Sequence, residues 1–316
     1  MPASAGESLE SLIQRSAARL DRAGLHFGHG TDNALDEAHW LVLHAIGLPV
    51  EEPVADYALA LTADEIAAAE ALIERRVGER RPAAYLTGSA WFAGLEFFVD
   101  ERCLVPRSPI AELIVDGFSA WLDPAGVDAV LDLCTGGGCI AIACAHAFPA
   151  ARVDAVDLSP AALEVARINI QRYALDGRVS ALQGDLFAPV AGRRYRLIVS
   201  NPPYVDAADL AAMPAEYRRE PQLGLAAGDD GLEIAARILR EARAHLADDG
   251  ILCVEVGNSA AALEARFPEL PFLWLEFASG DGGVFVLSAA ELDAAGFAAP
   301  ARADGFPRPN HPEEPR

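Results

Sequence analysis

The chain has 316 residues, of which 52% are hydrophobic, and a formal net charge of −22, so it can build one large core and a smaller appendage. It contains no run of 18 or more apolar residues, which argues against a membrane span, and residues 1–7 lack the basic and apolar regions of a signal peptide. The negative charge argues against a protein that grips DNA and favours a basic protein partner, although acidity also serves solubility.

The first part of the chain is predicted to be a small helical domain, which we place at residues 1–81. Apolar residues recur there at helical spacing, namely Leu9, Leu12, Ile13, Ala17 and Leu20. Thr62 and Glu65 have the spacing of a capping box that starts a further helix. Four arginines cluster near the end of that helix: Arg75, Arg76, Arg80 and Arg81. We expect them to be a solvated basic end that complements the helix dipole, with contact to RNA as the alternative.

A hairpin linker is expected over residues 82–105. Pro82 ends the helical domain, and the segment 85–105 alternates in polarity around Gly94. We place the catalytic domain after this linker, at residues 106–290.

A glycine-rich turn connects the first strand of this domain, at 130–133, to a helix that begins near Cys139. Glycines let the backbone approach a nucleotide-type ligand closely, and the absence of a following Lys-Ser/Thr pair argues against a Walker loop. The candidate cofactor-binding residues of this turn are Asp132, Cys134, Thr135, Gly136, Gly137 and Gly138. A purely structural helix start is the alternative.

Two further strands lead to acidic residues. The strand at 152–156 ends at Asp157, and an acidic residue at this place usually accepts hydrogen bonds from ribose hydroxyls. A capping or turn carboxylate is the alternative. Asp185 follows the third strand and is a candidate acceptor for an adenine amino group, and Leu186 belongs to the same candidate cofactor site.

The most informative motif, Asn201-Pro202-Pro203-Tyr204, follows a fourth buried strand at 195–200. The prolines fix their own φ and donate no hydrogen bond, so backbone carbonyls there are free to accept one. One carboxamide, free carbonyls and an aromatic face suit a planar –NH2 group. The motif therefore predicts chemistry on an amide or amino nitrogen, with a rigid turn as the alternative.

The end of the chain is predicted to complete a sheet. Residues 251–256 read as a fifth strand, and 272–277 with 284–287 read as a final antiparallel pair. We expect 291–316, which is proline-rich toward its end, to be a disordered tail.

Cysteine and histidine usage predicts no metal site. The five cysteines form no Cys-x-x-Cys pair, and the seven histidines are scattered. An odd number of cysteines in apolar settings fits a reducing cytosol, so we expect a cytoplasmic protein.

The order of the motifs resembles that of class I S-adenosylmethionine-dependent methyltransferases, in the branch that methylates amino and amide nitrogens. Residues 90–101, 104–114 and 216–228 are similar to the protein-glutamine methyltransferases, and the similarity extends over most of the chain. The resemblance implies an α/β, Rossmann-like fold with a seven-stranded, mostly parallel sheet and a C-terminal antiparallel hairpin. It also implies that the small N-terminal helical domain recognises the protein substrate.

The resemblance implies a role for each residue of the catalytic turn. The Asn201 side-chain oxygen and the Pro202 carbonyl would accept the two N–H bonds of a glutamine amide, and Pro203 completes the turn. Tyr204 would stack against the amide, while S-adenosylmethionine supplies the methyl group.

Two branches of this family differ in their protein substrate. Enzymes that methylate release factors usually carry Pro-Arg-Pro-Asp-Thr-Glu where this chain has residues 106–112, and glycine where it has Cys134. Both departures match the branch that methylates a glutamine in the third protein of the large ribosomal subunit. The resemblance thus implies a basic ribosomal protein as the substrate, either free or within a pre-ribosomal particle. The alternatives are release-factor methylation, nucleic-acid amino-methylation, and a non-catalytic assembly factor.

Overall fold

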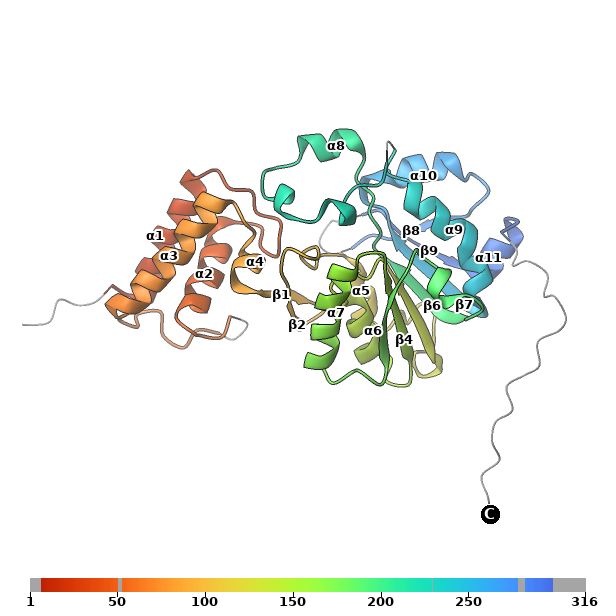
Figure 1. Ribbon diagram of the computed structural model, residues 1–316, viewed down its shortest axis with the longest axis horizontal. Coiled ribbons are helices and arrows are strands. Elements are labelled where there is room, and N and C mark those ends of the chain that lie inside the picture. The colour runs from red at the N-terminus through yellow and green to blue at the C-terminus, as the bar shows by residue number, and fades with distance from the viewer. Residues whose placement is uncertain (1–6, 51–52, 229, 278–281, 298–316) are drawn as a thin grey trace, which may run out of the picture.

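The structure, a computed structural model, describes residues 7–50, 53–228, 230–277 and 282–297. A helical domain lies on one side of a larger α/β domain, with a short hairpin between them (Figure 1). The helices of the first domain are α1 (Leu9–Arg22), α2 (Ala34–Ala45) and α3 (Ala63–Glu79). They enclose a core in which Leu9, Leu12 and Leu43 are fully buried. Thr62 and Glu65 form the predicted capping box at the start of α3.

The arginines at the end of α3 are not the solvated basic end that we expected. Arg76 is completely buried, with its Nε 2.7 Å from Glu37 Oε1, and Arg80 Nη2 lies 2.9 Å from Glu216 Oε1. A buried charge is tolerated when it is paired, so these two arginines form part of the junction with the α/β domain. Arg75 and Arg81 pair with Glu79, and Arg81 also pairs with Glu101.

The linker contains the expected hairpin and one helix that the sequence did not predict. Strands β1 (Ser89–Phe92) and β2 (Leu95–Phe98) pair antiparallel. Helix α4 (Ala83–Thr87) precedes them. We had interpreted Pro82 as the end of the helical part, but a proline without an N–H is equally suited to a helix start.

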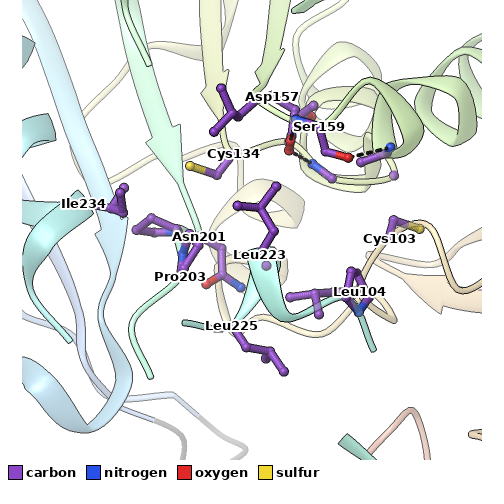
Figure 2. A pocket seen from close by; sticks show the side chains of 18 of the residues that line it. Cys103, Leu104, Cys134, Asp157, Ser159, Asn201, Pro203, Leu223, Leu225 and Ile234 are labelled. Carbon is purple, nitrogen blue, oxygen red and sulfur yellow. Dashed lines mark hydrogen bonds between the residues drawn. The ribbon is translucent and has the colours of Figure 1, made fainter. Parts of the chain in front are cut away.

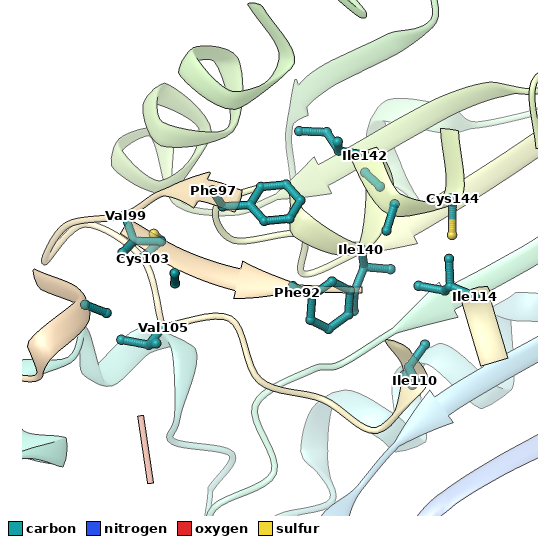
Figure 3. Packing of buried hydrophobic residues seen from close by; sticks show 14 of the residues in the cluster. Phe92, Phe97, Val99, Cys103, Val105, Ile110, Ile114, Ile140, Ile142 and Cys144 are labelled. Carbon is teal, nitrogen blue, oxygen red and sulfur yellow. The ribbon is translucent and has the colours of Figure 1, made fainter. Parts of the chain in front are cut away.

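Strand β2 contacts helix α7 (Pro160–Arg172), and Phe92 and Phe97 of the hairpin belong to the same buried cluster as residues of α5 (Ile110–Val115) and α6 (Cys139–Ala147). Figure 3 shows Phe97 near Ile142 and Phe92 near Ile140 in one buried cluster. The linker is therefore part of the large core.

Within the described residues, the main sheet has seven strands in the predicted mostly parallel arrangement. In sheet order they are β5 (Val179–Gln183), β4 (Arg152–Asp157), β3 (Ala129–Leu133), β6 (Tyr195–Ser200), β7 (Leu246–Glu255), β9 (Val284–Ser288) and β8 (Leu273–Trp274). Strand β9 is antiparallel to both β7 and β8.

Helices cover both faces of this sheet. They include α7, α9 (Glu233–His245) and α10 (Ala260–Arg266). Helix α8 (Ala207–Ala212) buries none of its residues and lies away from the sheet, in the segment between β6 and α9 (Figure 1). Val130 and Leu197 belong to the core that contains α6, whereas the next residues, Leu131 and Ile198, belong to the core that contains α9. This alternation is that of a strand buried on both faces.

The strand order reverses between β3 and β6, and this switch point places the site. Leu133 lies opposite Ser200 in the parallel register of the two strands. Because the carboxyl ends of parallel strands meet at one edge, the turns that begin at Cys134 and Asn201 are neighbours.

The predicted tail begins too early. Residues 289–294 form helix α11, whose capping box joins Ser288 to Glu291, and Leu292 is fully buried. These residues close the α/β core, and the rest of the predicted tail, 298–316, lies outside the described residues. Residues 1–6, part of the segment expected to lack signal-peptide character, also lie outside them.

Among the helices of the described chain, none is long and apolar enough to cross a membrane.

Candidate active site

A cavity of about 340 Å³ opens at the carboxyl edge of the sheet. Figure 2 shows Cys134, Asp157 and Asn201 around this space. Most of the sequence-predicted site residues line it: Cys134, Thr135, Gly136, Gly137, Asp157, Asp185, Leu186, Asn201, Pro202, Pro203 and Tyr204. Asp132 and Gly138 are not among the lining residues.

The turn after β3 needs glycine for backbone conformation and for packing. Gly136 and Gly138 have φ of 55° and 82°, a region that residues with a Cβ rarely adopt. A Cβ at Gly137 would lie 3.1 Å from Cys103 Sγ, so this glycine also allows close approach of the loop before α5. Cys134 has a φ of 59° although it is not glycine.

Asp132 stabilises the turn from behind. Its side chain is completely buried, and its Oδ2 accepts hydrogen bonds from the Thr135 hydroxyl and from the Ala141 backbone N–H, the latter at 3.1 Å. Burial raises the pKa of Asp132 to about 7, against the opposing effect of these two bonds. The carboxyl group therefore ties the glycine turn to the first turn of α6.

Asp157 lines the cavity and also shapes its wall. Its two oxygens accept the Gly136 N–H and the Ser159 N–H, each at 2.8 Å. The turn and capping role that was the alternative is thus present, and each carboxylate oxygen retains a second lone pair for a ligand.

The second acidic residue of the predicted cofactor site is more exposed. Asp185 Oδ2 lies 2.7 Å from Arg237 Nη2, and about half of the Asp185 side chain is accessible. Leu186, which follows it, is buried and adopts a positive φ of 47°. The pair forms the far wall of the cavity.

In the turn after β6, the Asn201 amide has a defined orientation. Its Nδ2 donates a hydrogen bond to the Arg107 backbone carbonyl at 3.3 Å. The structure contains no hydrogen bond to Asn201 Oδ1 from any residue that it describes. The amide therefore presents an acceptor to the cavity.

Tyr204 is fixed at its hydroxyl and at its ring. The hydroxyl donates to Glu255 Oε1 at 2.9 Å, and the other oxygen of Glu255 accepts from the Ser108 hydroxyl at 2.5 Å. A Cβ at Gly257 would lie 2.7 Å from the Tyr204 ring, so glycine is needed for this contact. Burial, and then the Glu255 charge, raises the pKa of Tyr204, which keeps the phenol neutral.

Sequence reasoning missed the residues that support the catalytic turn. Arg107 makes a two-pronged ion pair with the buried Glu220, with nitrogen–oxygen distances of 2.8 and 2.6 Å. Ser108 and Glu255 anchor Tyr204 as described. The available signal was the family similarity of residues 104–114 and 216–228, which indicated no individual role.

In the part of the chain that the structure covers, no group of three or more His, Cys, Asp or Glu side chains could hold a metal ion.

Comparisons with known proteins show which families and relatives this chain is similar to. Residues 117–216 match the family described as Methyltransferase small domain, and residues 11–88 match the PrmC N-terminal domain. The chain is similar to a protein of Burkholderia pseudomallei named ribosomal protein uL3 glutamine methyltransferase, with 51% identity over 91% of this chain and 96% of the relative. A protein of Xylella fastidiosa with the same name is 52% identical over 92% of this chain and 94% of the relative.

Among solved structures, the chain is similar in fold to a methyltransferase from Pyrococcus furiosus. It is 22% identical, covers 62% of this chain and 89% of its own, and superposes with a TM-score of 0.45. A likeness at this level carries no argument about the substrate.

Proposed function

The chain belongs to the family of ribosomal protein uL3 glutamine methyltransferases, and on that premise we propose that it transfers a methyl group from S-adenosylmethionine to the side-chain amide nitrogen of a glutamine in uL3. The observation that carries the proposal is the register of β3 and β6, which brings the glycine turn and the Asn-Pro-Pro-Tyr turn to one cavity. The turn that we propose for the cofactor would then lie beside the turn that we propose for the amide.

The residues of the cavity fit S-adenosylmethionine. A Cβ at Gly136 would meet nothing within 4 Å, so the turn leaves space for a ligand. Asp157 would accept the ribose hydroxyls, and Asp185 would accept the adenine amino group, because both side chains line the cavity. When bound, the cofactor supplies an electrophilic methyl group on sulfur.

Asn201 and its neighbours would orient the glutamine amide. The amide nitrogen is a poor nucleophile, so its position decides the rate. Asn201 Oδ1 and the Pro202 carbonyl would accept its two N–H bonds, while the fixed Tyr204 ring packs on its face. Orientation of this kind contributes up to about 7–11 kcal/mol in favourable intramolecular reactions, and acceptors aimed at the positive charge that develops on nitrogen add to it.

The helical domain would supply the recognition of uL3. The whole chain is strongly acidic, with a net charge of −22, so a basic ribosomal protein is attracted to it while DNA is repelled. We place the reaction in the cytoplasm, on uL3 that is free or assembling into a pre-ribosomal particle.

A methylation assay with competing substrates tests this function. Purified chain and methyl-labelled S-adenosylmethionine are incubated separately with uL3, with a peptide-chain release factor and with single-stranded DNA. We expect label only on a glutamine of uL3. Labelling of the release factor instead would assign the chain to the sister activity, and labelling of DNA would contradict a protein substrate.

A further inference from the structure

The segment that follows the catalytic turn contains two buried glutamates, which have different hydrogen-bond and ion-pair partners. Glu216 is completely buried and Glu220 is 3% exposed, and the chain between α8 and α9 lies next to the helical domain (Figure 1). Glu216 pairs with Arg80 at 2.9 Å, and its Oε1 also accepts the His26 backbone N–H at 3.2 Å. Glu216 therefore ties this segment to the helical domain.

Glu220 lies between the helical domain and the cavity. On the side of the helical domain, His29 Nε2 lies 3.3 Å from Glu220 Oε2. On the side of the cavity, Glu220 accepts two hydrogen bonds from the Arg107 guanidinium and a third from the Val105 N–H at 2.9 Å. The Arg107 guanidinium also packs over the Tyr217 ring, 5.2 Å from its centroid.

The anchored Arg107 in turn determines the orientation of Asn201. Its backbone carbonyl accepts the Asn201 Nδ2 hydrogen bond. The two ends of a carboxamide are nearly the same size, so only the hydrogen-bond partners decide which one faces the substrate. If this carbonyl moved, the Asn201 amide could rotate and present N–H groups to the N–H groups of the glutamine, which would prevent binding in the reactive pose.

We propose that Glu220 is a positioning residue for the catalytic turn: it fixes Arg107, whose carbonyl keeps the Asn201 oxygen directed at the substrate amide. The inference rests on the proposed function, because the glutamine amide is the group to be oriented.

The charge of Glu220 is maintained under all physiological conditions. Burial alone would raise its pKa, but the charge of Arg107 and the hydrogen bonds that it donates outweigh burial and hold the pKa of Glu220 below its usual range. Burial lowers the pKa of His29, so this ring is neutral near neutral pH. The interaction that defines the link is thus the buried pair of Glu220 with Arg107.

Glu220→Gln is the test, and Glu216→Gln is its matched control. The first change removes one of the two acceptors that the Arg107 fork needs. The second alters an equally buried glutamate whose hydrogen bonds and ion pairs, within the described residues, are with Arg76, Arg80 and His26 and with none of residues 105–108. We expect Glu220→Gln to lower kcat on uL3 roughly 10- to 100-fold, with the dissociation constant of S-adenosylmethionine and the KM for uL3 changed less than about twofold. Glu216→Gln should lower the melting temperature and leave kcat within about twofold of the wild type.

A conservative variant separates positioning from folding. Glu220→Asp keeps the charge and should recover part of the kcat lost in Glu220→Gln. If Glu220→Gln does not fold, Arg107→Lys takes its place, because lysine keeps the charge but cannot form the two-pronged pair. Equal losses of kcat in the Glu216 and Glu220 variants, or an unchanged kcat in Glu220→Gln, would overturn the proposal.

A measurement without substrate keeps this outcome separate from that of the proposed function. The side-chain amide protons of Asn201 are assigned by NMR from the signal that disappears in Asn201→Asp, and their exchange with solvent is followed in cofactor-free protein. We expect exchange at least about tenfold faster in Glu220→Gln than in the wild type and the Glu216→Gln control. Unchanged exchange refutes the link whatever the protein substrate proves to be.

Discussion

At the residue scale, the proposed mechanism depends on the acceptor that Asn201 presents to the cavity. Aspartate is similar in size and suits turns about as well, so a merely structural residue would tolerate Asn201→Asp. The structure shows Nδ2 donating to the Arg107 carbonyl. Aspartate loses this donor and adds a charge that must be desolvated. We predict a folded, cofactor-binding variant with kcat reduced at least roughly 100-fold, which is about 2.7 kcal/mol of barrier.

The alanine variant controls for the added charge. Asn201→Ala removes both the donor and the acceptor, and it should reduce kcat to a similar extent. Rates are measured at saturating cofactor, with the melting temperature as a check on folding. Wild-type rates in both variants would remove Asn201 from the mechanism.

Asp157 is predicted to contribute to cofactor affinity. Asp157→Ala should weaken S-adenosylmethionine binding by about 1–3 kcal/mol, because the ribose hydroxyls lose a charged acceptor. Calorimetric titration measures the affinity. Since the carboxylate also holds the Gly136 and Ser159 N–H groups, Asp157→Asn serves as the control that retains the size and one acceptor. Affinity that is unchanged in Asp157→Ala would show that the carboxylate acts in the turn alone.

Asp132 makes the stability depend on pH in a defined direction. Burial raises its pKa to about 7 from an ordinary value of 3.8, so the folded state holds the proton more tightly than the unfolded chain does. The stabilisation is full below the unfolded pKa and is lost as the pH rises through the folded pKa. Relative to Asp132→Asn, the wild type should lose about 3 kcal/mol of unfolding free energy between about pH 5 and about pH 8.

Urea unfolding of the two proteins without cofactor gives this difference, in which the other carboxylates cancel. If the unfolding free energy of the wild type relative to Asp132→Asn stayed constant or increased as the pH rises, Asp132 would be ionised in the folded protein throughout this range.

Sequence reasoning found the residues that touch the cavity more readily than those that hold them. Asn201 and Asp157 stand at the ends of recognisable strands, so local pattern is sufficient. Glu220 lies 113 residues from its partner Arg107, and nothing local distinguishes a buried, paired glutamate from a solvated one. Arg76 was misplaced for the same reason, because its partner Glu37 is 39 residues away.

At the element scale, strands such as β6 were predicted because a short apolar run that ends at a turn is typical of a strand buried in an α/β sheet. Short helices at the edges of the domains were harder to predict from the sequence. Helix α4 follows a proline that also reads as a stop signal, and α11 is a short segment whose burial of Leu292 depends on the rest of the core. Tertiary packing, more than propensity, decides such elements.

The β1–β2 hairpin should behave as a part of the large core. Phe97 is fully buried in the cluster with α6, whereas the neighbouring Phe98 on the other face of the strand is half-buried. We predict that Phe97→Ala costs about 3–5 kcal/mol of unfolding free energy and that Phe98→Ala costs clearly less. Denaturant unfolding of both variants measures the costs, and equal small losses would mean that the hairpin is a loosely attached linker.

At the scale of the whole molecule, the chain combines a strongly negative net charge with a site at the point where the strand order of the sheet reverses. The net charge of −22 acts over a distance and favours encounter with a basic protein. Contacts such as Arg80–Glu216 and His29–Glu220 tie the helical domain to the loop beside the cavity. The relative placement of the two domains follows from these long-range pairs, so the sequence pattern predicted both domains without predicting their junction.

The most direct test is the mass of uL3 from cells that lack this protein. Ribosomal proteins are isolated from the deletion strain, from the wild type, and from deletion strains that carry either the wild-type chain or Asn201→Ala. We predict that uL3 loses the mass of one methyl group at a glutamine in the deletion strain, that the wild-type chain restores it, and that Asn201→Ala does not. A uL3 mass that is the same in all four strains would contradict the account.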